Sequence, residues 1–182
     1  TENENARLRL RGIINENVRN YIINLKGCTP DVQRKIEQLP IPNDKFFLWH
    51  IYFKEVFDKG GFDIVIGNPP YIDSETMVKV MPSHRELYAK KFICASGNWD
   101  MFIVFIELGV SLLKEKGIFS NIIPNKLIAA KYGIELRKHL SLRHVLEIRD
   151  YSRIAVFADA DVYPITIVLR NDDNKDNTQT EN

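Results

Sequence analysis

The pattern of apolar positions divides the chain into a helical beginning and an α/β remainder. Over the first 25 residues apolar side chains recur every three or four positions, which predicts an amphipathic helix ended by Gly27. Pro30 and Asp31 favour the start of a second short helix. Between residues 46 and 57 aromatic side chains are dense, and their periodicity settles neither helix nor strand.

From Phe62 onward, short apolar runs alternate with helical patterns. A helix beginning near Phe102 has two candidate capping residues, Asn98 and Asp100, and Gly117 is expected to end it. Such alternation is typical of an α/β sheet with mostly parallel strands. The predicted strands are 62–67, 118–123, 145–149 and 165–169, with a further helix at 134–140.

Composition is that of an ordinary globular domain. The 182 residues are 45% hydrophobic and 10% aromatic, which suffices for one core, and the formal net charge of +1 favours no class of partner. No apolar stretch approaches the ~20 residues of a membrane span, and the first residues are polar, so we expect a reducing, cytoplasmic setting. Cys28 and Cys94 have the spacing of neither zinc ligands nor a disulfide framework, and no metal is expected.

The candidate chemistry lies in Asn68-Pro69-Pro70-Tyr71, directly after the apolar run 62–67. The two prolines have no backbone N–H, so the turn presents carbonyl oxygens without competing donors. Asn68 adds a side-chain carbonyl, and Tyr71 adds a ring face on which a flat group can stack. These four residues predict a pocket for a flat, amino-bearing group. An ordinary proline turn at the end of a strand is the alternative.

Other stretches accompany this motif in a fixed order. They are Trp49 with Phe53 to Phe57 before it, and Trp99 to Glu107, Ile123 to Lys126 and Val156 to Leu169 after it. As a set, they resemble the gamma-class adenine DNA methyltransferases, especially those of type IIG restriction-modification enzymes. The resemblance covers about residues 49–170. It implies the C-terminal half of a Rossmann-like class I methyltransferase sheet, with an antiparallel strand near 165–169 in its last hairpin.

The resemblance implies methyl transfer from S-adenosylmethionine to the exocyclic amine of an adenine flipped out of double-stranded DNA. The catalytic set would be Asn68 to Tyr71. The Asn68 side chain and the Pro69 main chain would hold both amino hydrogens, so that the nitrogen lone pair points at the methyl group. Tyr71 would stack on the base, and Phe157 falls where the family has a second aromatic ring. For Phe157, a core position at a hairpin is the alternative.

Further roles are implied for the methyl donor and for the DNA backbone. Phe105 would pack on the donor's adenine, with Asn68 as a second donor contact, although Phe105 also fits the inner face of an amphipathic helix. Lys126 and Lys131 are candidates for contacts with phosphates. Five more cations near the ends of elements are weaker candidates: Arg137, Lys138, Arg143, Arg149 and Arg153.

The glycine-rich loop that would bind the donor is missing before Gly60-Gly61. We therefore expect a central fragment of the catalytic domain that is inactive alone. Its partners would include an N-terminal half and a target-recognition domain of the parent chain. The expected organisation is a helical segment 1–45, a methyltransferase half-domain 46–170 and a disordered polar tail 171–182.

Two other functions fit the same motif. Enzymes that methylate protein glutamine or RNA guanine face the same lone-pair problem at an amide or amino nitrogen. The residues around Trp49 and the run Val162-Tyr163-Pro164 favour the DNA enzymes instead. The other alternative is an inactive module that binds DNA or an assembly partner, and binding of the methyl donor would separate it from an enzyme.

Overall fold

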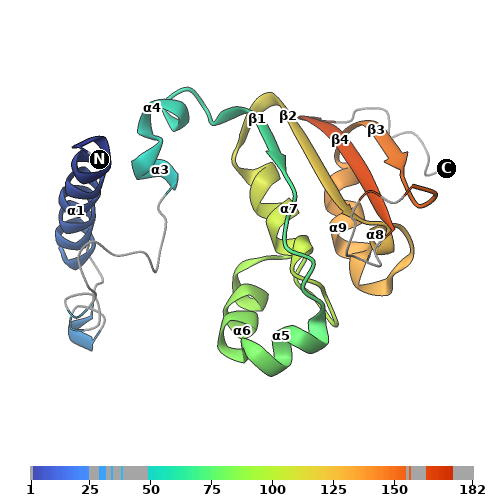
Figure 1. Cartoon of the computed structure of the whole chain (residues 1–182), viewed down its shortest axis with the longest axis horizontal. Coiled ribbons are helices and arrows are strands. Elements are labelled where there is room, and N and C mark those ends of the chain that lie inside the picture. Colours follow the sequence, from blue (N-terminus) through green and yellow to red (C-terminus); the bar gives the residue numbers. More distant parts are fainter. Residues whose placement is uncertain are drawn as a thin grey trace. The chain divides into compact units, whose positions relative to one another are not determined.

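The structure, a computed structural model, describes residues 2–24, 29–31, 34, 38, 49–154, 156 and 163–173. The chain divides into two units, Thr1–Phe53 and Lys54–Asn182. In the first unit, α1 (Glu2–Ile23) confirms the predicted long helix, and α3 (Trp49–Tyr52) is a single turn (Figure 1). The Tyr52 hydroxyl donates to the buried Asn15 Oδ1 at 2.7 Å, which ties α3 to α1. Gly27 lies outside the described residues.

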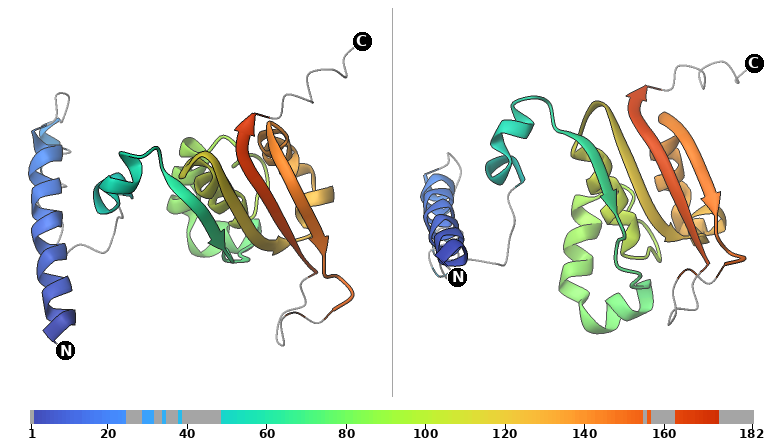
Figure 2. Two further views of the ribbon diagram at one scale, coloured as in Figure 1. Left: turned by 90° about the horizontal axis from the view of Figure 1, so that it is seen from above. Right: turned by 45° about the horizontal axis from the view of Figure 1, so that its top comes forward.

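The second unit is built on a sheet of four strands in the order β1-β2-β4-β3 (Figure 2). The strands are β1 (Phe62–Gly67), β2 (Leu113–Pro124), β3 (Arg143–Asp150) and β4 (Pro164–Asp173). β1 and β2 are parallel, whereas β4 runs antiparallel to both β2 and β3. This arrangement confirms the predicted α/β half-sheet with one antiparallel strand in its last hairpin. β4 continues to Asp173, so residues 171–173, which composition placed in the polar tail, belong to the strand.

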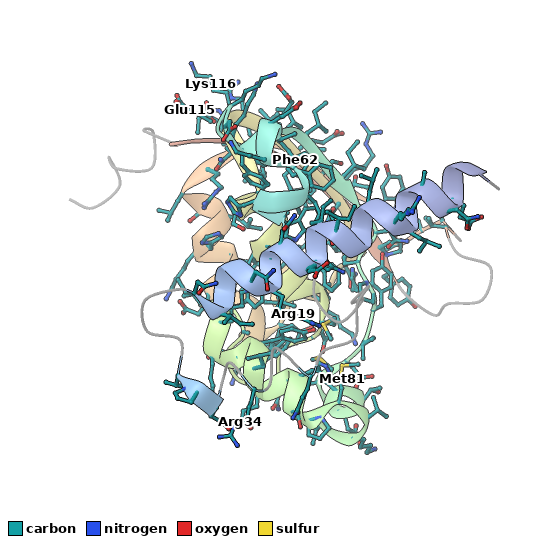
Figure 3. The ribbon with its side chains drawn as sticks, turned by 90° about the vertical axis from the view of Figure 1, so that its left-hand side faces the viewer. Arg19, Arg34, Phe62, Met81, Glu115 and Lys116 are labelled. Atoms are coloured by element: carbon teal, nitrogen blue, oxygen red, sulfur yellow. The ribbon has the colours of Figure 1, made fainter. Side chains whose placement is uncertain are left out.

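Helices connect these strands, and α7 packs against β2 while α9 packs against β3. Met81 separates α5 from α6, two helices that the apolar pattern did not predict (Figure 3). Two residues in this part of the chain are typical of helix starts. The Asp73 side chain caps α5 by accepting from the Thr76 N–H, and Pro82 is the first residue of α6. The helices of this unit are α4 (Lys54–Phe57), α5 (Ser74–Val80), α6 (Pro82–Lys91), α7 (Phe102–Ser111), α8 (Lys126–Ala129), η1 (Lys131–Gly133) and α9 (Ile134–Ser141).

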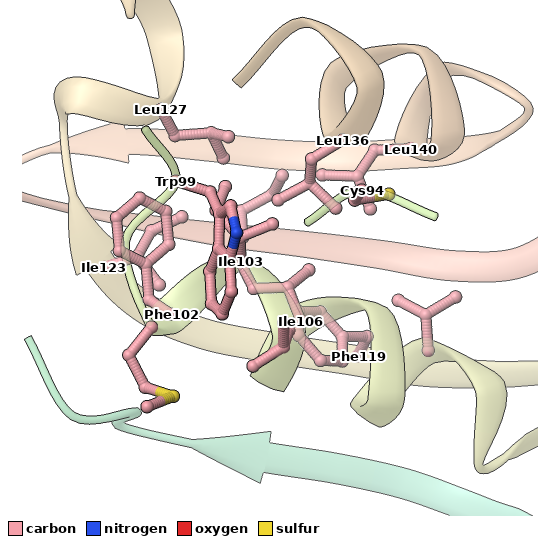
Figure 4. Close-up of a cluster of buried hydrophobic side chains, with 14 of the residues drawn as sticks. Cys94, Trp99, Phe102, Ile103, Ile106, Phe119, Ile123, Leu127, Leu136 and Leu140 are labelled. Carbon is pink, nitrogen blue, oxygen red and sulfur yellow. The ribbon is translucent and has the colours of Figure 1, made fainter. Parts of the chain in front are cut away.

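The core lies between α7, α9 and one face of the sheet (Figure 4). Alternate residues of β2 and β4 point into it, and Trp99 and Phe102 fill its centre. Phe105 is an exception to the predicted inner face of α7, since 44% of it is exposed. The other core residues include Ile103, Ile106, Phe119, Ile123, Leu136, Leu140, Ile165, Ile167 and Leu169.

Two predicted helix boundaries are wrong. α7 ends at Ser111, and Gly117 lies inside β2, where a Cβ would sit 2.8 Å from the Phe62 carbonyl oxygen. Gly117 therefore allows two strand backbones to approach, after a bend from which Glu115 and Lys116 project (Figure 3). At the other end no side chain caps α7, and the Asp100 carboxylate bonds to other elements.

Gly60 and Gly61 form a turn before β1, with φ of +97° and +126°. At Gly61 a Cβ would lie 2.7 Å from the Leu112 carbonyl oxygen, which also accepts the first bond of β1 from Phe62 at 2.9 Å. The turn thus seats β1 beside β2 only because Gly61 has no side chain.

We expect Gly61→Ala to destabilise the chain by about 3 kcal/mol, since backbone strain adds to a clash with immovable backbone atoms. Urea unfolding of the 182-residue chain measures this loss. Gly97→Ala is the matched control, because Gly97 also has positive φ (+68°) but meets nothing within 4 Å. It should cost about 1 kcal/mol. Equal losses in the two variants would show that close packing at Gly61 is unimportant.

Candidate active site

The Asn-Pro-Pro-Tyr turn begins where β1 ends. Gly67, the last residue of β1, pairs with Asn121 of β2, and a Cβ at Gly67 would lie 2.8 Å from Asn121 Oδ1. A side chain at Gly67 would therefore require the Asn121 amide to move. Pro69 is buried, whereas Asn68 is exposed. The turn is therefore anchored by a proline while the amide of Asn68 faces solvent.

Tyr71 is held by its hydroxyl. The half-buried ring places this hydroxyl 3.1 Å from the Ile122 carbonyl oxygen of β2, to which it donates. Burial raises the pKa of Tyr71 above its ordinary value, so the hydroxyl keeps its proton and remains a donor. The orientation of the ring is thus set by the strand that neighbours β1.

The residues after the turn are fixed to the segment that leads into α7. The Met101 N–H donates to the Ile72 carbonyl at 2.8 Å, and the Ser74 N–H donates to Asp100 Oδ1 at 3.1 Å. The turn is consequently braced on both sides, by β2 through Tyr71 and by the start of α7 through Ile72 and Ser74.

A cavity of about 130 Å³ opens beside Tyr71. It brings Tyr71 together with Lys126, both of which were predicted from the sequence, and with the 57% exposed ring of Tyr163, which was not. The Asn125 N–H donates to the Tyr163 carbonyl at 2.8 Å and so joins the end of β2 to the start of β4. The sequence feature that could have pointed to Tyr163 is its place directly before Pro164, the first residue of β4. The other lining residues are Asp73, Asp100, Phe102, Pro124 and Asn125.

The cavity contains charges of both signs. The backbone N–H of Thr76 donates to Asp73 and lowers the pKa of this carboxyl, and the positive charge of Lys126 adds a smaller effect. Asp73 and Asp100 place two carboxylates against the single lysine of the lining. Both Asp100 oxygens already accept from groups of the protein, so Asp73 and Lys126, both exposed, are the charged side chains of the lining that face solvent.

The remaining predicted site residues lie elsewhere. Phe105 is on α7 and Lys131 is in η1, and neither lines the cavity beside Tyr71. Asn68, Pro69 and Pro70 also lie outside its lining. Phe157 lies outside the described residues.

Four of the weaker candidates are bonded within the chain. Arg137 donates to the carbonyls of Leu127 and Ala130, and Arg143 donates to the His139 carbonyl and to Asn171 Oδ1. Lys138 and Arg149 pair with Glu135 and Glu147.

The described part of the chain has no group of three or more metal-ligating side chains. No described helix is long and apolar enough to cross a membrane.

Solved structures resemble the fold only distantly. A Listeria monocytogenes chain described as a class I S-adenosylmethionine-dependent methyltransferase matches with a TM-score of 0.45 and 19% identity, over 63% of this chain and 33% of that chain. A modification subunit assigned to a type I restriction enzyme of Vibrio vulnificus matches with a TM-score of 0.43 and 15% identity, over 66% of this chain and 25% of that chain.

Sequence relatives are closer. The type II restriction enzyme and methyltransferase RM.Eco57I of Escherichia coli is 32% identical over 117 residues, 64% of this chain and 12% of the relative. The type II methyltransferase M.BstVI of Geobacillus stearothermophilus is 27% identical over 143 residues, 78% of this chain and 24% of the relative. The chain therefore spans between about an eighth and a quarter of the length of these two relatives.

The predicted resemblance to restriction-modification methyltransferases is confirmed by a family match. Residues 3–157 match the family described as Eco57I restriction-modification methylase, which is well over half of the chain. This chain belongs to the Eco57I restriction-modification methylase family.

Proposed function

We propose that this chain supplies the target-base half of the active site in a longer DNA adenine methyltransferase of a restriction-modification system. The observation that carries the proposal is the braced turn after β1, which exposes Asn68 beside the buried Pro69 and the fixed ring of Tyr71. Membership of the Eco57I family supports the reaction class. The relatives' names as restriction-modification methyltransferases favour DNA over protein glutamine or RNA guanine as substrate.

The turn has the chemistry that an aromatic amine requires. The lone pair of an exocyclic amine is delocalised into its ring, so the amine is a weak nucleophile. Asn68 Oδ1 and the Pro69 carbonyl would accept the two amino hydrogens and favour a pyramidal nitrogen. This is catalysis by preorganised acceptors, and it needs no strong general base.

The methyl donor in this proposal is S-adenosylmethionine, which supplies an electrophilic methyl group when bound. Phe105 fits a contact with the donor's adenine, because it is a large ring left 44% exposed on an otherwise largely buried helix. Asn68 would be the second contact. The main donor loop and the target-recognition domain belong, in this proposal, to parts of the enzyme beyond the helical segment 1–45 and the half-domain 46–170.

Capture of the flipped adenine would use the ring of Tyr71, whose orientation is fixed by Ile122. Phe157 is proposed as the second stacking ring. Lys126, exposed at the cavity, and Lys131, exposed in η1, are proposed contacts of the DNA backbone. Phosphate contacts of this kind add affinity without reading sequence. We propose that the enzyme acts in the cytoplasm.

We expect Asn68→Ala in the full-length enzyme to lower the rate of methyl transfer at least a hundredfold, because one preorganised polar contact is lost. DNA binding should stay within about twofold, since phosphate contacts lie elsewhere. Single-turnover transfer of labelled methyl groups and a gel-shift assay measure the two quantities. Asn98→Ala, at an exposed asparagine away from the turn, is the matched control. A variant that keeps more than a tenth of the wild-type rate would reduce Asn68 to a turn residue.

Tyr71→Ala should weaken capture of the flipped base by roughly tenfold to a hundredfold, because stacking contributes about 1–3 kcal/mol per base. The fluorescence of 2-aminopurine at the target position reports extrusion, and this signal should be altered in the variant. Tyr71→Phe keeps the ring but removes the bond to Ile122, so its loss should stay below tenfold. Stacking is ruled out if the alanine variant matches wild type, or if phenylalanine is as damaging as alanine.

A further inference from the structure

Asp100 is a buried carboxylate that joins three elements of the second unit. Only 8% of it is exposed. Its Oδ1 accepts from the backbone N–H of Ser74 at 3.1 Å, and its Oδ2 accepts from the hydroxyl of Tyr132 at 2.7 Å. Ser74 begins α5, Tyr132 lies in η1, and Asp100 itself precedes α7. Each oxygen therefore fixes a different part of the chain.

These bonds are directed away from the helix that Asp100 precedes. An aspartate at this place would ordinarily cap its own helix, yet no side chain caps α7. Nor is Asp100 the cap of α5, whose cap is Asp73. The carboxylate thus links separate elements, and burial makes those bonds necessary, because a buried carboxylate without partners is strongly destabilising.

The elements that Asp100 joins carry residues of the proposed reaction. Ser74 stands three residues after Tyr71, and the adjacent Met101 N–H also bonds to Ile72. Phe105 stands five residues after Asp100 on α7. Asp100 thereby connects the segment that leaves the turn with the helix that faces the proposed donor.

The partner hydroxyl is well suited to a permanent bond. Burial and the neighbouring Asp100 carboxylate raise the pKa of Tyr132 well above its ordinary value. The phenol therefore keeps its proton, and remains a donor, well above neutral pH. The Tyr132 ring also packs edge-on against Phe102, with ring centroids 6.5 Å apart, which holds the hydroxyl in place.

We propose that Asp100 is a positioning residue for methyl transfer. It holds the segment Ile72–Ser74 against the start of α7 and against η1, so that Asn68 and Tyr71 keep their geometry toward base and donor. The inference rests on the proposed function. Because both carboxylate oxygens have partners within the protein, Asp100 acts through the turn, and its loss should change the rate of the chemical step more than the binding of either substrate.

Three variants of the full-length enzyme test this role. Tyr132→Phe removes one bond to Asp100 and leaves the ring, and it should lower kcat about tenfold. Asp100→Ala removes both bonds and should lower kcat about a hundredfold, the loss expected when reacting groups shift by about 1 Å. Asp100→Asn keeps an acceptor and should restore a large part of the loss. The KM for DNA and for S-adenosylmethionine should stay within about twofold in all three. Tyr88→Phe, on α6, is the control for loss of a tyrosine hydroxyl.

Amide hydrogen exchange on the 182-residue chain tests, without any catalysis, whether the bonds of Asp100 hold Ser74 in place. Tyr132→Phe and Asp100→Asn should each speed exchange at Ser74 about tenfold, and Tyr88→Phe should not. If exchange at Ser74 stays slow in both variants, Asp100 does not hold this segment, whether or not the enzyme methylates DNA. A wild-type enzyme that does not methylate DNA would refute only the proposed function. With an active wild type, an unchanged kcat in Tyr132→Phe and Asp100→Ala, or a raised KM with unchanged kcat, overturns the positioning role.

Discussion

The close parallel pairing of β1 with β2 at Gly67 and Asn121 determines where the Asn-Pro-Pro-Tyr turn can lie. A side chain at Gly67 would enter the space of the Asn121 amide. The end of the turn contacts the same strand, because the Tyr71 hydroxyl donates to the carbonyl of Ile122, the next residue along β2. One strand thus sets both the entry into the turn and the orientation of its aromatic ring. The exposed Asn68 lies between these two fixed points.

Most large side chains of α7 are buried in the core, whereas two aromatic rings, one on this helix and one before β4, are exposed. On α7 the residues from Phe102 to Val110 are mostly buried, but Phe105 is open to solvent, and so is the ring of Tyr163 before β4. Single exposed rings are common on protein surfaces, so the placement of these two rings is what matters. Phe105 lies on α7, whose start is bonded to the segment after the turn, and Tyr163 lines the cavity beside Tyr71, so both positions agree with the proposed contacts to donor and base.

The sequence predicted the local features well and the long-range ones poorly. The four strands and the candidate turn follow from short patterns of glycine, proline and apolar residues, whereas the sequence did not predict the order β1-β2-β4-β3 in the sheet. Gly117 was misjudged because a glycine that ends a helix and one that admits a neighbouring backbone look alike in sequence. The prediction of Asp100 as a helix cap is wrong for a different reason. Its partners Ser74 and Tyr132 are 26 and 32 residues away along the chain, and a local pattern cannot reveal them.

Within the proposed reaction, the described cavity residues also decide how the amine is activated. Asp73 is a poor proton acceptor, because its pKa is lowered by the bond from the Thr76 N–H that caps α5. Asp100 has both oxygens engaged by donors of the protein itself. Neither carboxylate is placed to remove a proton from a substrate before the methyl group arrives. In this proposal the acceptors at Asn68 and Pro69 prepare the nucleophile, and acceptor catalysis depends on geometry to within fractions of an ångström. That dependence is the physical reason for bracing the turn on both sides, through β2 and through Asp100.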